Sequence, residues 1–313
     1  MSSNKPKFSK RLLYPKFWLT WFWFALWRLL LFLPYPALVS IGSGLGLLLH
    51  KLPTRRKKIA LTNIQICFAD LDEKQQRALL RANFISMGIA LMETGMSWWW
   101  PKKRLQPLIQ YRGLEHLNAL EGKPVIVLGI HHTTLEISAA AISSKTQVDG
   151  MYRAHKNAVY DYIQSRGRLN HGIEGCTVIE RSDVRGAIKG LKADRKLWYL
   201  PDHDYGLKQG LFAPLFGVQA ATLYTTARLA DKTNARVLPV SCVRLSGTKG
   251  YEFTVYPPLE NFPVGDDLAD ATTVNRKIEE MITLKPEQYL WAHRRFKNRP
   301  EGEEDVYNFS KAS

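Results

Sequence analysis

From about residue 105 onward the chain alternates short apolar runs with segments of helical pattern. The apolar runs read as strands, and they are 124–130, 151–153, 177–180, 196–201, 235–244 and 251–258. The segments that read as helices are 158–169, 184–192, 222–231 and 271–282. Strands that alternate with helices predict an α/β fold, in which helices flank a mostly parallel central sheet. Functional sites in such folds gather beyond the carboxyl ends of the strands.

A helical region precedes this part of the chain, from about Ile59 to Trp100. Asp70–Glu73 marks the start of one helix, and Trp98–Pro101 ends the region abruptly. The tryptophans there form either a packed corner or a hydrophobic lip near a membrane. We therefore expect three domains, which are a basic amino terminus with a membrane anchor (1–50), a helical connector (51–105) and an α/β domain (106–313).

The amino-terminal segment Phe17–Leu33 is nearly all apolar and contains four tryptophans. As one helix it would extend about 25 Å, which is marginal against a hydrocarbon core of about 30 Å. Pro34 and Pro36 then break the helix, and Ala37–Leu49 resumes the apolar pattern. A cleavable signal peptide is disfavoured by the tryptophans and by the lack of an A-x-A site. A buried core helix is the second alternative, and we expect the third, an uncleaved membrane-anchor helix that spans the bilayer or lies in its interface.

The charge of the chain is strongly positive. There are 44 Lys and Arg against 28 Asp and Glu, a net charge of +16, and the first acidic residue is Asp70. Such a surface attracts anions, which include nucleic acids, anionic lipids, phosphorylated substrates and acidic proteins. The three cysteines share no close spacing and suggest neither a zinc site nor a disulfide framework. Their use fits a reducing cytoplasmic setting.

The apolar run 124–130 leads directly into His131-His132-Thr133-Thr134-Leu135-Glu136. If the strand ends near His131 and a helix starts at Thr133, Glu136 lies in the first turn and folds back toward the imidazole. A histidine base oriented by a carboxylate is a common arrangement for removing a proton from a hydroxyl. Thr133 and Glu136 also have the spacing of a capping box, in which the glutamate would serve only the helix start. The spacing alone leaves both interpretations open.

Several blocks in this order resemble the lipid A branch of the glycerolipid and lipid A acyltransferase superfamily. His131 and Glu136 match its H-x4-D/E motif, and glutamate is the usual acid of that branch. The further matching blocks are MYRAHKNAVYD (151–161), RGRLN (166–170), ERSDVRGAIKGLK (180–192), LWYLPDHDYG (197–206) and PEQYLWAHRRFKNRP (286–300). The last two look like the lauroyltransferase type. With the amino-terminal anchor the resemblance covers nearly the whole chain, and the departures at His132, Thr133 and Asn298 leave the acyl-chain preference open.

This resemblance implies an O-acyltransferase that moves a fatty acyl group, of the lauroyl type, from acyl carrier protein to a hydroxyl of a hydroxyacyl chain on a Kdo-bearing lipid A precursor. His131 would be the general base and Glu136 its orienting acid. Asp202 would complete the catalytic set, either beside His131 or by holding an arginine. The positions implied for substrate binding are Arg153, Arg168, Asp204, Arg294 and Arg295.

The implied cosubstrate is acyl carrier protein carrying the acyl thioester, and no other cofactor is expected. The implied partners are this carrier, the lipid precursor and the membrane, without nucleic acid, and the implied location is the cytoplasmic side of a bacterial inner membrane. A metal held by His131, His132, Asp202, His203 and Asp204 is a further alternative, although acyl transfer needs no metal. A basic cluster at residues 293–299 would grip lipid phosphates or the acidic carrier, or would be a solvated tail.

Two other functions stay open at this point. A glycerolipid acyltransferase with a lysophospholipid acceptor is the first, although aspartate would be more typical of it at position 136. A non-catalytic binder of membranes or nucleic acid is the second, and it rests on the positive charge alone.

Overall fold

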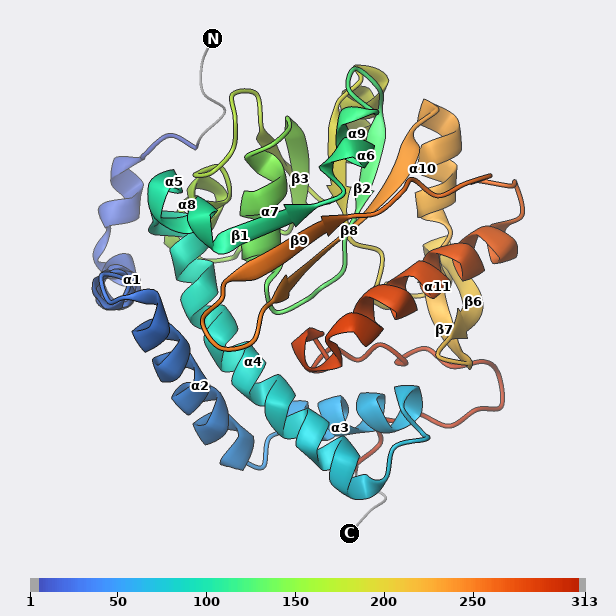
Figure 1. Ribbon diagram of the computed structural model, residues 1–313, viewed down its shortest axis with the longest axis horizontal. Coiled ribbons are helices and arrows are strands. Elements are labelled where there is room, and N and C mark those ends of the chain that lie inside the picture. The colour runs from blue at the N-terminus through green and yellow to red at the C-terminus, as the bar shows by residue number, and fades with distance from the viewer. Residues whose placement is uncertain (1–5, 310–313) are drawn as a thin grey trace.

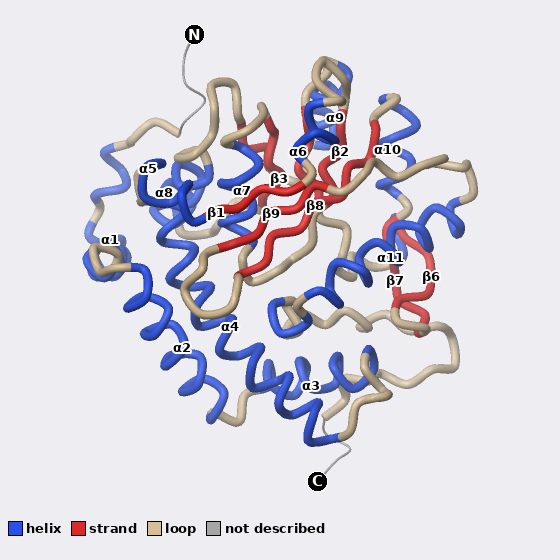
Figure 2. Tube along the Cα trace, in the orientation of Figure 1, coloured by secondary structure: helices blue, strands red, loops and turns tan. Residues whose placement is uncertain are grey.

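The computed structural model describes residues 6–309 and has a seven-stranded sheet at its centre (Figures 1 and 2). In chain order the strands of this sheet are β1 (Ile109–Arg112), β2 (Val125–Leu128), β3 (Val148–Tyr152), β4 (Thr177–Glu180), β5 (Lys196–Tyr199), β8 (Arg236–Arg244) and β9 (Tyr251–Val255). Their order across the sheet is β1-β9-β8-β2-β5-β3-β4. Of the pairings in the described sheet, β8–β9 is antiparallel and the rest are parallel. The predicted α/β fold with a mostly parallel sheet is therefore confirmed.

Helices flank the sheet, and a separate two-stranded hairpin stands beside it in Figure 1. The helices are α1 (Trp18–Leu30), α2 (Tyr35–Lys51), α3 (Arg55–Cys67), α4 (Glu73–Trp99), α5 (Lys102–Leu105), α6 (Leu114–Asn118), α7 (Leu135–Ser143), α8 (Ala158–Arg168), α9 (Val184–Lys192), α10 (Thr225–Thr233) and α11 (Asp267–Leu284). The hairpin consists of β6 (Gly210–Leu215) and β7 (Val218–Leu223).

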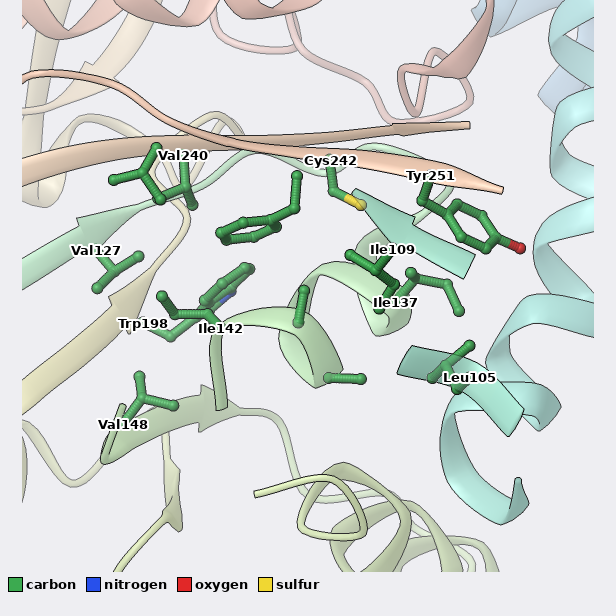
Figure 3. Close-up of a cluster of buried hydrophobic side chains, with 14 of the residues drawn as sticks. Leu105, Ile109, Val127, Ile137, Ile142, Val148, Trp198, Val240, Cys242 and Tyr251 are labelled. Atoms are coloured by element: carbon green, nitrogen blue, oxygen red, sulfur yellow. The ribbon is translucent and has the colours of Figure 1, made fainter. Parts of the chain in front are cut away.

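Two hydrophobic clusters fix the helices on the sheet, one on each face. Successive side chains of a strand point to opposite faces, and accordingly Val125 and Val127 of β2 join one cluster while Ile126 and Leu128 join the other. The first cluster joins the sheet to α7, α2 and the carboxyl half of α4 (Figure 3). The second joins it to α3, α9, α11 and the amino half of α4. Because β2 is buried on both faces, its sequence is continuously apolar.

All of the predicted strands form, and 177–180 coincides with β4. The predicted helices 158–169, 184–192 and 271–282 correspond to α8, α9 and α11. The predicted helix 222–231 is α10, but it begins only at Thr225 because the preceding residues end β7. The hairpin β6–β7 and the edge strand β1 were not predicted.

The apolar amino-terminal segment forms one helix that stops before Pro34, as expected, although this helix is shorter than Phe17–Leu33. Helix α1 ends at Leu30 and Pro34 is the N-cap of α2, which runs alongside α4 (Figure 1). Among the described helices, none has both the length and the apolar content that crossing a bilayer requires. The expectation of a membrane-spanning helix is therefore wrong. The proline break and the burial of Phe24 and Leu31 against the rest of the chain are the physical reasons.

Helices α2 and α4 cross at glycines, and this crossing ties the amino terminus to the domain. A Cβ atom built on Gly88 of α4 would lie 2.7 Å from the Cα of Gly46 in α2, and it would also overlap the carbonyl oxygen of Gly42. Only glycine permits backbones to approach so closely. Both ends of α4 are formed as predicted. Asp72 and Gln75 make a capping box at its start, and Trp100 is its C-cap.

Candidate active site

The centre of the site lies where two neighbouring parallel strands end. Strands β2 and β5 pair with Leu128 opposite Tyr199, and His131 and Asp202 each follow three residues later. The two side chains therefore emerge at the same edge of the sheet. Nδ1 of His131 lies 2.7 Å from Oδ1 of Asp202, and the backbone N–H of His131 donates to Oδ2 at 2.9 Å.

Asp202 is fully buried and is held as a carboxylate. Burial by itself raises the pKa of this carboxyl, but the charge of His131 and the hydrogen bonds from it outweigh burial, so the pKa is held well below its usual range. Tyr289 Oη donates a further hydrogen bond to Oδ2 at 3.0 Å. Because the carboxylate can only accept, Nδ1 of His131 carries the proton and Nε2 is the free basic atom.

Glu136 does not take the position that the sequence predicted for it. Its carboxylate accepts from Arg168 Nη2 at 2.6 Å, from Arg168 Nε at 3.0 Å and from Trp98 Nε1 at 2.9 Å. The predicted pairing with His131 is corrected accordingly, since Asp202 occupies the Nδ1 side of that ring. Glu136 does lie in the first turn of its helix, as predicted.

The alternative interpretation of Glu136 as a helix cap is also wrong. Helix α7 begins at Leu135 with Thr134 as its N-cap, and no side chain caps it. Thr134 Oγ1 instead donates to the carbonyl oxygen of Cys242 on β8, and Thr133 Oγ1 pairs with Ser86 Oγ on α4. The threonines therefore fix the loop to its neighbours.

The loop that carries His131 is fixed by α4 on one side and by residues 288–290 on the other. The carbonyl oxygen of His131 accepts from the N–H of Leu290, and the N–H of Thr133 donates to the carbonyl oxygen of Gln288. Gln288 is itself fixed by two hydrogen bonds with the backbone of Arg244. Arg244 forms a buried ion pair with Glu93 of α4. This set of contacts leaves the backbone around His131 little freedom.

A cavity of about 1000 Å³ opens in front of His131. Its walls are largely apolar and include Leu135, Ala139 and Ile142 of α7, together with Val148 and Trp198 from the sheet. Polar groups converge at the end where the strands finish. Mostly apolar cavities with a few convergent polar groups are the usual form of small-molecule sites.

The structure brings most of the predicted substrate-binding residues to this cavity. Arg153, Arg168 and Asp204 line it, together with His131 and Glu136. Asp204 accepts hydrogen bonds from the backbone of Gly206 and from Asn298, so it also fixes the loop after β5.

The remaining two predicted positions do not line the cavity. Arg295 is buried and donates to the carbonyl oxygen of Ala221 at 2.7 Å, so its guanidinium lies inside the protein. Arg294 approaches Asp305 and covers the ring of Tyr307. The segment 293–299 is therefore partly a structural support rather than a free basic tail.

Two histidines that the sequence interpretation did not assign to catalysis lie against the base. The rings of His131 and His203 are parallel within 13°, with centroids 3.6 Å apart. His293 stacks on the other face of His203, with centroids 3.8 Å apart and an angle of 10°. His203 belongs to the D-H-D element and His293 to the H-R-R element. The sequence signal that could have pointed to both histidines is that these elements lie in blocks that resemble the family. Trp98, whose indole binds Glu136, was likewise not foreseen, and it is part of a packed corner.

Within the described residues, His131, Asp202 and His203 have candidate ligand atoms within 4.8 Å of one another. The arrangement does not suit a metal ion. Stacked parallel rings direct their nitrogen lone pairs alongside each other instead of toward one point, and Asp202 is occupied by hydrogen bonds from His131 and Tyr289. The donor set fits a hydrogen-bonded base.

Comparison with known proteins shows the family to which this chain belongs. The family described as bacterial lipid A biosynthesis acyltransferase matches residues 5–298. The chain belongs to this family. It is 39% identical over 303 residues to the lipid A biosynthesis lauroyltransferase of Escherichia coli strain K12, which covers 96% of this chain and 98% of that protein. The lipid A biosynthesis myristoyltransferase of the same strain is 27% identical over 96% of this chain and 94% of that protein.

A second close relative carries a different acyl specificity in its name. The lipid A biosynthesis palmitoleoyltransferase of Escherichia coli strain K12 is 36% identical over 96% of this chain and 98% of that protein. The chain is thus an O-acyltransferase of the lipid A biosynthesis type, which overturns the alternative of a non-catalytic binder. The two identities differ too little to decide the acyl chain.

Proposed function

We propose that this acyltransferase moves a fatty acyl group, with lauroyl as the favoured chain, from the thioester of acyl carrier protein to a hydroxyl of a hydroxyacyl chain on a Kdo-bearing lipid A precursor. The observation that carries the proposal is the His131–Asp202 pair at the polar end of an apolar cavity. The resemblance of the blocks at 197–206 and 286–300 to the lauroyltransferase type supports the proposed acyl chain. The apolar walls suit an acyl tail, and the arginines that line the cavity suit anionic groups of the two substrates.

In this mechanism His131 is the general base. Nε2 takes the proton of the acceptor hydroxyl while Asp202 fixes the tautomer and stabilises the imidazolium. The hydroxyl oxygen attacks the thioester carbonyl, and the tetrahedral intermediate then loses the carrier thiolate as the C–S bond breaks. The imidazolium returns its proton to the thiolate, so the products are an ester and the carrier thiol. No net proton is gained or lost.

Arg168 is proposed to stabilise the charge that develops on the thioester oxygen. Glu136 engages Nε and Nη2 of the guanidinium, which fixes it in the cavity wall. A positioned cation that faces the developing oxyanion lowers the barrier more than a mobile one does. Glu136 thus acts through Arg168, and Asp202 is the acid that orients His131.

We also propose that α1 lies in the interface of the inner membrane, with the catalytic domain on the cytoplasmic side where the carrier protein is found. Trp18, Leu19 and Trp23 are 65%, 67% and 61% exposed, and Phe22 and Leu29 extend the same apolar surface. Tryptophan beside basic residues is typical of interfacial helices. Replacing Trp18, Leu19 and Trp23 together by Ser is expected to weaken vesicle binding at least tenfold.

Leu268 on α11, half exposed and remote in sequence from this surface, provides a control in Leu268→Ser. Sedimentation with vesicles of phosphatidylglycerol and phosphatidylethanolamine measures the effect. Unchanged binding of the triple variant would remove α1 from the proposal.

The function is tested with the purified chain, carrier thioesters of different acyl lengths, and lipid A precursors with and without Kdo. Mass spectrometry of the products is expected to show transfer of the lauroyl group to the Kdo-bearing precursor in preference to longer chains. A lysophospholipid is included as a competing acceptor. Preference for the lysophospholipid, or for a longer acyl chain, would contradict the corresponding part of the proposal.

A further inference from the structure

Three imidazole rings, one of them that of the proposed base, form one continuous stack. His131 lies at one end, His203 in the middle and His293 at the other end, with centroid separations of 3.6 and 3.8 Å. They come from three distant parts of the chain, namely the ends of β2 and β5 and the segment after β9 and α11. The three rings are therefore brought together by the tertiary fold and not by closeness in sequence.

The ring faces, rather than the nitrogen atoms, account for this arrangement. Nε2 of His203 and Nε2 of His293 are buried, and neither has a hydrogen-bond partner among the described residues. A buried polar atom without a partner costs free energy and calls for an explanation. Hydrogen bonds through these two atoms therefore do not hold the rings in place, and the parallel contact of the ring faces is the interaction that positions them.

The imidazole rings of His203 and His293 are uncharged at neutral pH. Burial lowers the pKa of His203 to about 3 and that of His293 to about 4, because it outweighs the opposing effect of the Asp202 carboxylate. The proposed base therefore lies against a ring that stays uncharged, namely that of His203. A neutral aromatic face favours a cation placed against it.

We propose that His203 is a positioning residue for the base, backed by His293, and that its ring face holds the imidazole of His131 in the plane that directs Nε2 into the cavity. This inference rests on the proposed role of His131 as general base. Asp202 fixes the edge of the imidazole at Nδ1, and a hydrogen bond at one atom leaves the ring free to tilt about that bond. Contact over a whole face removes the tilt.

In this proposal the D-H-D and H-R-R elements both position the base, although they are about 90 residues apart in sequence. Misplacement of a reacting group by about 1 Å costs on the order of 100-fold in rate. The effect of losing the face is therefore expected in kcat, because neither ring needs to contact a substrate for it.

The test compares His203→Leu, His203→Gln and His203→Phe with the parent chain, using the carrier thioester and lipid precursor. Leucine and glutamine are expected to lower kcat about 10- to 100-fold with KM for both substrates within about twofold, and phenylalanine is expected to recover most of kcat. His293→Leu is expected to have a smaller effect because it acts through His203. His116→Leu on α6 is the matched control outside the stack.

Thermal unfolding separates folding defects from positioning, and the ¹⁵N resonances of His131 report its tautomer and ring mobility independently of activity. A parent-like kcat in His203→Leu would overturn the inference, and so would a His203→Phe variant that is folded but as slow as His203→Leu. His131→Ala is run in the same assay. If His131→Ala is inactive and His203→Leu is normal, the stack alone fails, whereas full activity of His131→Ala overturns the general-base mechanism and this inference together.

Discussion

At the scale of single residues, His131 depends on Asp202 for the place of its proton. Replacing Asp202 by Asn removes the charge while keeping the shape, so the imidazole loses the partner that fixes its tautomer and stabilises its charged form. We expect kcat to fall about 10²- to 10⁴-fold, the range seen when an orienting carboxylate is removed from such a base. Steady-state kinetics with the carrier thioester measure the loss.

Circular dichroism is the control in this experiment, because Asp202 also accepts from Tyr289 and its loss must not be confused with unfolding. A folded Asp202→Asn chain with kcat within threefold of the parent would contradict the role of the pair.

The pair formed by Glu136 and Arg168 is expected to couple strongly. Their side chains are 11% and 20% exposed, so removing one partner leaves a largely buried charge unpaired. Glu136→Gln and Arg168→Gln are each expected to lower the free energy of unfolding by about 2–4 kcal/mol, and the double variant by less than the sum of the two. Urea unfolding of the four chains measures the coupling.

Activity in the same chains distinguishes the two roles of Glu136. If it acts through Arg168, as the contacts indicate, Arg168→Gln and the double variant have the same reduced kcat. A double variant that is much slower than Arg168→Gln would show that Glu136 has a second catalytic role.

The residue pairs of the site were only partly predictable. The sequence placed His131 at a strand end and Glu136 in a first helical turn, because both follow from local pattern. It could not tell that β2 and β5 are neighbours, and this adjacency is what brings Asp202 to His131. Arg168 lies 32 residues from Glu136, and His203 meets His293 across 90, so sequence spacing held no information about either contact.

At the scale of secondary-structure elements, the crossing of α2 and α4 is expected to tolerate no side chain. Gly88→Ala would place a methyl group against the backbone of Gly42 and Gly46, so the helices would have to separate. We expect the free energy of unfolding to fall by about 2–4 kcal/mol, as in overpacked cores that must shift backbone. Thermal or urea unfolding measures it.

Helix α2 supplies a matched control for this substitution. A Cβ atom at Gly44 meets nothing within 4 Å, and alanine is the better helix former by about 1 kcal/mol. Gly44→Ala is therefore expected to be neutral or stabilising. Equal effects of Gly44→Ala and Gly88→Ala would mean that helix propensity, and not the crossing, decides both.

The hairpin β6–β7 shows why some elements escape prediction. Pro214 lies within β6, and a proline inside an apolar run argues against a strand unless the strand is at an edge. The turn joins the strands through Phe216 and Gly217, both with positive φ, where Asn-Gly or Asp-Gly is the usual signal. Thr222 and Leu223, which end the hairpin, were assigned to the following helix because both states tolerate them.

At the scale of the whole molecule, buried neutral histidines make stability depend on pH. Burial lowers the pKa of His132, His171 and His293 to about 4 and that of His203 to about 3. In the unfolded chain these groups take up protons near pH 6.5, so below that pH the unfolded state binds more protons than the folded state. The contribution of these histidines to the free energy of unfolding is thus constant above about pH 7 and falls as the pH drops from about 6.5 toward 4.

Each of these histidines contributes a slope of at most about 1.4 kcal/mol per pH unit in that window. Urea unfolding at several values from pH 7.5 to pH 5 measures the total. His171→Phe, outside the stack, is expected to flatten the curve by one histidine's share. Stability that stays level or rises as the pH falls would contradict the assignment of neutral, buried rings.

The loop around His131 takes its backbone partners from Gln288 and Leu290, and the His203 ring that stacks on His131 is backed by His293. Ribosomal synthesis proceeds from the amino terminus, so the strands and α4 exist well before these residues leave the exit tunnel. A nascent chain therefore has the walls of its cavity but an unfinished base. A chain truncated after Leu284 lacks Gln288, Leu290 and His293, and we expect it to be inactive even where its sheet has formed.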